Sequence, residues 1–233
     1  HALTAAIKLA PQHALGWTLL GLVHEAKGDP KSALTHLEKG SQLGDSEYLS
    51  QYNMGRFLTS ENKAGQGVPY LLRAVAIDPK NSDGLIALGL AQLQLKQVPR
   101  AIESLPKATK SAPKNLDAWA TLADVQFGQR DFKGALATLD AGLKAVGDQP
   151  VLLEKAVATS MMLNDPKLGI GYAERSLKVV PSYKQGWLNL AQLAMLAGDG
   201  DKSIAAARQL LTLDPTHWEA WFHLGNVYDA LPD

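Results

Sequence analysis

Histidines and one acidic loop are the residues of this chain whose types could bind a metal ion or a phosphate. The six histidines are His1, His13, His24, His36, His217 and His223. No two of them are four residues apart, the spacing that places two histidines on one helical face to bind zinc. The stretch GDGDKS at 198–203 resembles a phosphate or calcium loop, but it has no Gly-Lys-Ser/Thr run. A calcium loop would also need Gly and Glu where Ile204 and Leu210 stand. We therefore expect no metal site and interpret 198–203 as a turn between helices.

The other reactive side chains do not form a recognisable catalytic pattern. Cysteine is absent, which excludes thiol chemistry and disulfides. The carboxylates occur singly, so their spacing indicates no acid–base pair. No nucleophile-elbow, kinase or dinucleotide-binding motif is present. We expect a protein that is not an enzyme, with no catalytic residues and no cofactor.

The balance of charge argues against a nucleic-acid partner. The 233 residues include 23 Lys and Arg and 23 Asp and Glu, whereas proteins that bind nucleic acids usually carry a basic patch or a high pI. No apolar run approaches the roughly 20 residues that cross a bilayer, so no membrane insertion is expected. The composition indicates a soluble protein and leaves its compartment open, cytoplasmic or periplasmic. Because the chain begins at His1 rather than Met, we expect it to be a fragment of a longer chain.

Four of the five tryptophans share one phase of a 34-residue period. They are Trp17, Trp119, Trp187 and Trp221. Two columns of mostly small residues keep the same period: Gly21, Gly55, Gly89, Ala123, Val157, Ala191 and Gly225, and Ala33, Gly67, Ala101, Ala135, Gly169 and Ser203. A further column holds Pro11, Pro79, Pro113, Pro181 and Pro215. A fixed period of this length is typical of a repeat protein.

Each period is predicted to form two helices joined by a short turn. In residues 116–129, Trp119 and Phe127 belong to an apolar set at helical spacing, and residues 132–145 show the same spacing. The turn between them is predicted at 130–131. A helix of about 13 residues is marginal alone in water. Its apolar stripe must therefore be covered by its partner helix and by the next pair, as in a solenoid.

Two prolines interrupt this pattern inside second helices. A proline in a helix interior removes one backbone hydrogen bond and costs about 3 kcal/mol. We expect the helix that contains Pro69 to begin late, and Pro106 to kink the helix near 98–111.

These features resemble the tetratricopeptide repeat (TPR) family. The residues that carry the resemblance are Pro113, Trp119, Leu122, Ala123, Ala135 and Leu139, with Trp221, Leu224, Gly225 and Tyr228 near the end. The resemblance implies an all-α fold, a right-handed superhelical solenoid of stacked antiparallel helix pairs. We expect a single solenoid over residues 1–233. Its expected parts are a half repeat 1–13, full repeats 14–47, 48–81, 82–115, 116–149, 150–183 and 184–217, and a half repeat 218–233.

In this family the first helix of each pair lines a concave groove, which implies a binding surface. The residues that the phase places there are Tyr52, Asn53, Arg56, Ile86, Leu90, Asp124, Phe127, Glu154, Met161, Asn189, Gln192, Phe222 and Asn226. Many are apolar, aromatic or Met, as adaptable recognition surfaces often are. Asp124 and Glu154 make the middle acidic. The expected partner is a protein or peptide with apolar anchors and basic residues, bound as a helix or an extended segment.

The function that we predict is a non-catalytic scaffold that binds a protein segment in its concave groove. One alternative is the substrate-recruiting arm of a larger glycosyltransferase, hydroxylase or sulfotransferase. Another is an assembly or secretion component that self-associates end to end through its terminal helices.

Overall fold

The computed structural model describes residues 2–230, and the regular secondary structure of these residues is helical throughout. The helices are α1 (Ala2–Leu9), α2 (Ala14–Ala26), α3 (Pro30–Leu43), α4 (Tyr48–Ser60), α5 (Ala64–Ile77), α6 (Ser82–Gln94), α7 (Val98–Ser111), α8 (Leu116–Gly128), α9 (Phe132–Val146), α10 (Pro150–Met162), α11 (Pro166–Val179), α12 (Lys184–Leu196), α13 (Gly200–Leu213) and α14 (Trp218–Ala230). From α4 onward, each helix begins 34 residues after the helix two places before it, as Ala14 of α2 and Tyr48 of α4 show. Residue 1 is the start of the first predicted half repeat, and residues 231–233 are the end of the last one. These residues lie outside the described part of the chain.

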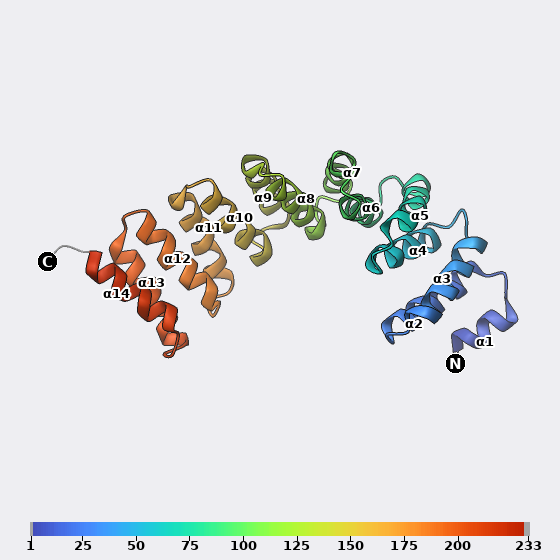
Figure 1. Cartoon of the computed structure of the whole chain (residues 1–233), viewed down its shortest axis with the longest axis horizontal. Helices are drawn as coiled ribbons and strands as arrows, with labels where there is room; N and C mark the ends of the chain where they lie inside the picture. Colours follow the sequence, from blue (N-terminus) through green and yellow to red (C-terminus); the bar gives the residue numbers. More distant parts are fainter. Residues whose placement is uncertain (1, 231–233) are drawn as a thin grey trace. The chain divides into compact units, whose positions relative to one another are not determined.

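The chain divides into two compact units, unit 1 (residues 1–112) and unit 2 (residues 113–233). In unit 1, α2 packs on α3, α4 on α5 and α6 on α7. In unit 2 the pairs are α8 with α9, α10 with α11 and α12 with α13, and these appear as neighbouring ribbons in Figure 1. Within each unit the second helix of a pair also packs against the first helix of the next pair, and α14 packs against α13. The all-α fold of stacked helix pairs is therefore confirmed.

A residue in the left-handed region joins the two helices of each pair. These residues are Gly28, Asn62, Lys96, Arg130, Asn164 and Gly198, with φ between 55° and 78°. At several of these turns the next residue is an aspartate whose carboxylate caps the second helix. Asp131 accepts the backbone amide of Gly134, and Asp199 accepts that of Lys202. The turns predicted at 130–131 and within 198–203 are thus confirmed, and Asp199 serves as a helix cap.

The prediction that the helix containing Pro69 begins late is wrong. α5 begins at Ala64 and continues through Pro69 to Ile77. Pro69 and Gly65 are both exposed. The carbonyl of Gly65, whose helical partner would be the missing amide of residue 69, can therefore be solvated instead of being left buried. α7 likewise runs through Pro106 without interruption, from Val98 to Ser111.

The tryptophan and proline columns of the sequence meet in one repeated contact. In each case the indole Nε1–H donates to the carbonyl of the proline six residues earlier, at 2.8–2.9 Å. The pairs are Trp17 with Pro11, Trp119 with Pro113, Trp187 with Pro181, and Trp221 with Pro215. Gln51 occupies the tryptophan position of its repeat, and its Nε2 donates to the carbonyls of Ser41 and Gly44 at 2.8 and 3.0 Å. In each of these repeats a side chain at the tryptophan position thus bonds the carbonyls that precede the first helix.

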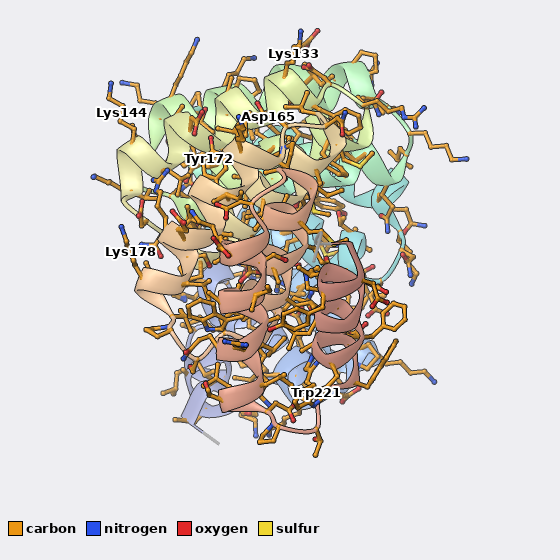
Figure 2. The ribbon with its side chains drawn as sticks, turned by 90° about the vertical axis from the view of Figure 1, so that its left-hand side faces the viewer. Lys133, Lys144, Asp165, Tyr172, Lys178 and Trp221 are labelled. Carbon is orange, nitrogen blue, oxygen red and sulfur yellow. The ribbon has the colours of Figure 1, made fainter. Side chains whose placement is uncertain are left out.

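Helix α14 is held to unit 2 by a small apolar face and one buried histidine. Leu224 and Val227 are buried, and His223 Nε2 lies 2.8 Å from the buried Ser203 Oγ. Trp221, which Figure 2 labels, lines a shallow pocket with Leu224 and with Leu211 of α13, and it remains 58% exposed. Burial lowers the pKa of His223, an effect that the nearby Ala191 carbonyl partly offsets.

We predict that α14 detaches more readily in acid because burial disfavours the charged form of His223 in the folded unit. Its folded pKa lies below the ordinary value of about 6.5, so its contribution to stability is complete above about pH 6.5 and is lost as the pH falls through the folded pKa. Amide hydrogen exchange of α14 at about pH 7.5 and about pH 5.5 measures this. His223→Gln should remove most of the difference in α14 hydrogen exchange between the two pH values. An equal pH effect in that variant would contradict the assignment to His223.

Candidate functional site

Within each unit the Cα atoms of the first helices of successive pairs come within 8 Å of one another, and those of the second helices do not. α2 contacts α4 and α4 contacts α6, while α8, α10, α12 and α14 contact in the same order. Among the described residues, successive second helices have no Cα atoms this close, and in unit 2 they are linked by longer side chains such as Tyr172. The first helices are therefore packed more closely, which makes their side the inner, concave side of each unit. All of the predicted groove residues lie on first helices.

Three of the predicted groove residues in unit 1 are packed inside it. Asn53 and Ile86 are each 8% exposed, and Asn53 Nδ2 donates to the carbonyl of Leu49 at 2.8 Å. Tyr52 is half-buried and stacks on Tyr48 with ring centroids 5.5 Å apart. Burial, with a smaller contribution from a neighbouring carboxylate, raises the pKa of Tyr52. In this conformation these side chains mainly support the packing of unit 1.

The other two predicted groove residues of unit 1 reach its surface. Arg56 makes a bidentate ion pair with Glu25 of α2, at 3.0 and 2.5 Å, and so connects two first helices. Leu90 of α6 is 44% exposed, the most open apolar side chain among the predicted residues of this unit.

In unit 2 the structure brings two predicted residues together in a pocket. Asp124 and Phe127, both on α8, line a pocket of about 220 Å3 between α8 and α10. The remaining lining residues are Ala123, Leu139, Lys155, Ala158 and Thr159. The ring of Phe127 is held edge-on against Phe132 of α9, with centroids 5.1 Å apart. This pocket, which we call the concave pocket, has an apolar floor and a charged rim.

An ion pair forms the rim of the concave pocket and links its two helices. Lys155 Nζ of α10 lies 2.5 Å from Asp124 Oδ1 of α8. The Asp124 side chain remains 58% exposed, and its other carboxylate oxygen accepts no hydrogen bond from the described residues. The sequence reasoning did not predict Lys155 as a site residue. The only available signal was its position directly after Glu154, because its contact with Asp124 depends on how α8 and α10 pack.

Three other predicted residues of unit 2 take part in polar contacts or lie partly buried. Glu154 is half-buried, and its carboxylate adds to the burial that raises the pKa of Tyr183. Asn189 Oδ1 accepts a hydrogen bond from Gln185 one turn earlier, at 3.0 Å. Gln192 is half-buried. These residues extend a mixed polar strip along α10 and α12.

The last three predicted residues are exposed. Met161, at the end of α10, is 42% exposed, and Phe222 of α14 is 64% exposed beside Trp218. Asn226 is also exposed. Among the described residues, no group of three or more His, Cys, Asp or Glu side chains is placed to hold a metal ion. None of the helices in the described part of the chain combines the length and apolarity that crossing a membrane requires.

This arrangement defines a helical-repeat scaffold for protein–protein interaction. Three family models, each described as a tetratricopeptide repeat, match residues 1–44, 96–155 and 184–227. The chain belongs to the tetratricopeptide repeat family.

Individual relatives are similar over only part of their own length. Superkiller complex protein 3 of Mus musculus is 28% identical over 188 residues, which is 76% of this chain and 12% of that protein. Anaphase-promoting complex subunit 3 of Schizosaccharomyces pombe is 26% identical over 141 residues, or 60% of this chain and 21% of that protein. The similarity therefore covers less than a quarter of the length of either relative.

A solved structure supports the fold over nearly the whole chain. It is the C-terminal part of a TPR repeat-containing protein from Cytophaga hutchinsonii, with a TM-score of 0.78. The similarity covers 96% of this chain and 93% of that one at 16% sequence identity. At this identity the likeness concerns the fold alone.

Proposed function

We propose that this chain is a non-catalytic scaffold that binds a segment of a partner protein on its concave side, with the concave pocket of unit 2 as the anchoring point. The observation that carries the proposal is the pocket between α8 and α10, where Phe127 and the Asp124–Lys155 pair surround an apolar floor. Apolar pockets with a few convergent polar groups are the usual binding sites of proteins. The related proteins are, by name, members of a Superkiller complex and of an anaphase-promoting complex, which agrees with a role in assembly.

The shape and charge of the concave pocket favour one kind of ligand. A volume of about 220 Å3 is suited to one large apolar side chain. Asp124 is more than half exposed although one of its oxygens pairs with Lys155. It can therefore accept a further hydrogen bond from a Lys or Arg next to the anchor. Unit 2 contains 14 Asp and Glu against 11 Lys and Arg, which also favours a basic segment.

We predict that peptides selected from a random phage-displayed library on this protein carry a large apolar residue beside Lys or Arg. Phe127→Ala should weaken their binding at least tenfold, because it removes the wall of the pocket that buries the anchor. Fluorescence anisotropy with the selected peptides measures the change, and circular dichroism checks that helical content is retained.

Leu196→Ala provides the matched control, because it removes an exposed leucine of α12 that does not line the pocket. Its affinity for the same peptides should equal that of the parent. Selected peptides that bind Phe127→Ala as tightly as the parent protein would overturn the assignment of this pocket.

A further inference from the structure

The second helices of unit 1 leave an open groove on the side away from the first helices. The groove lies between α5 and α7, and α6, which packs against both, forms its floor. It encloses about 530 Å3. One wall carries Val68, Leu72 and Val75 of α5, and the other carries Arg100 and Lys107 of α7. We call this surface the α5–α7 groove.

At the corresponding positions in unit 2, side chains bridge neighbouring second helices. The phenol of Tyr172 on α11, labelled in Figure 2, donates to Asp140 of α9 at 2.6 Å. Two repeats earlier in the sequence, Ser104 and Leu72 stand at the positions of Tyr172 and Asp140. A small residue and an apolar residue thus replace the bridging pair. No hydrogen bond or ion pair between the described residues joins α5 to α7, and the space between them stays open.

The spacing of the lining residues fits the surface of another helix. Val68, Leu72 and Val75 follow one another at i, i+4 and i+7 on α5, and Arg100, Ser104 and Lys107 do so on α7. Each set covers two helical turns, about 10 Å. Such rows are the ridges between which the ridge of a third helix packs. Leu72 is 51% exposed. It lies next to Val68 and Val75 and so forms part of an apolar strip, which a binding partner can cover.

The charged side chains of the α7 wall determine which charge the bound helix should carry. Within the described residues, neither Arg100 nor Lys107 has a carboxylate within 4.0 Å, and Arg100 Nη1 donates to the amide oxygen of Gln97. Glu103, the acidic residue of the same wall, can neutralise one of the two cations, which leaves an excess positive charge. Covering an unpaired cation is costly unless the covering group supplies a carboxylate. Unit 1 as a whole has 12 Lys and Arg against 9 Asp and Glu.

We propose that the α5–α7 groove docks an amphipathic helix of a partner protein, with its apolar stripe on the α5 wall and an acidic flank on the α7 wall. This surface is separate from the concave pocket and does not depend on it. The chain would then hold two protein segments of opposite charge preference, a basic one on the concave side of unit 2 and an acidic one on the outer side of unit 1.

The test uses two labelled synthetic helical peptides of about 18 residues with the same leucine stripe. One carries glutamates along a flank of the stripe and the other carries lysines at the same positions. In anisotropy titrations of the whole chain, the glutamate peptide should bind at least tenfold more tightly than the lysine peptide. Equal affinity of the two peptides would overturn the proposal.

Two substitutions locate the binding of the glutamate peptide in the groove. Ser104→Tyr should fill the groove as Tyr172 does in its own repeat, and should weaken binding at least tenfold. If circular dichroism shows that this variant is misfolded, Leu72→Ser gives the same test, because the side chain that it shortens is already half exposed. Unchanged affinity in the folded variant would contradict docking in this groove.

Three further variants distinguish the effect of charge on binding from the location of the binding site. Lys107→Glu should weaken binding of the glutamate peptide several-fold, while Lys133→Glu, the same change on an exposed residue of α9 in unit 2, should not. Phe127→Ala, which alters the concave pocket, should leave the affinity of the glutamate peptide unchanged. If Phe127→Ala weakens it and Ser104→Tyr does not, the peptide binds on the concave side and the proposal of an outer groove fails.

Discussion

Replacement of Gly67 by alanine should lower the free energy of unfolding of unit 1 by about 2–3 kcal/mol, although the equivalent position in three other repeats is already alanine. A Cβ at Gly67 would lie 2.7 Å from the carbonyl oxygen of Gly55 on α4. A Cβ at Gly55 would in turn lie 2.9 Å from the carbonyl oxygen of Gly67. The close neighbours are backbone atoms, which cannot rotate away. The two helices would have to separate, and the packing of Leu71 against Gly55 would be lost with them.

A matched glycine shows the opposite expectation. Gly171 lies inside α11, and a Cβ added there would have no atom within 4 Å. Gly171→Ala should therefore raise the stability of unit 2 by about 0.5–1 kcal/mol, since alanine loses less backbone entropy on forming a helix. Urea titration followed by circular dichroism compares the two variants, and hydrogen exchange assigns each effect to its helices. If Gly67→Ala is as stable as the parent, α4 and α5 do not approach each other as closely as described.

Replacement of Gln51 by alanine should cost about 3 kcal/mol, the second large effect. The side chain is fully buried, and its Nε2 donates to the carbonyls of Ser41 and Gly44 at the end of α3. The alanine variant would leave both carbonyls without this donor and would create a cavity. Gln51→Met fills most of the volume but has no hydrogen-bond donor. Its decrease in the free energy of unfolding should therefore lie between zero and the decrease caused by alanine.

Denaturant unfolding of the parent and the two variants measures both contributions. Gln42→Ala is a suitable control, because Gln42 is exposed on the last turn of α3, and its loss should be within about 0.5 kcal/mol of zero. A loss below about 1 kcal/mol for Gln51→Ala would show that water or a rearranged backbone replaces the two hydrogen bonds.

The helices and their turns could be predicted because they depend on residues close in sequence. Trp119, Pro113 and the turn at Arg130 recur with a fixed phase, and the first helices begin with that phase. The continuation of α5 through Pro69 could not be predicted by the same reasoning. The continuation of α5 depends on whether the freed carbonyl of Gly65 faces solvent, and the spacing of residues in the sequence does not indicate this.

The candidate site could be predicted only in part, since helical phase gives the direction of a side chain and not the distance to its neighbours. Phase placed Asp124 and Phe127 on one side of α8, and both line the concave pocket. It also placed Asn53 and Ile86 on first helices, where the structure buries them. Lys155 and the α5–α7 groove depend on contacts between helices 30 or more residues apart in sequence, and no local pattern encodes such contacts.

The bonds between four of the five indoles and a proline carbonyl give this chain a set of intrinsic fluorescent reporters. Trp17 is the sole tryptophan of residues 1–112, and the other four lie in residues 113–233. The indole of Trp17 donates to Pro11 and stacks near His36, with ring centroids 5.8 Å apart, so its emission responds to the state of α2 and α3. Substituting that one residue with phenylalanine leaves a protein whose tryptophan emission follows unit 2 alone. The difference spectrum then follows unit 1, and the melting of each half can be recorded without attaching a dye.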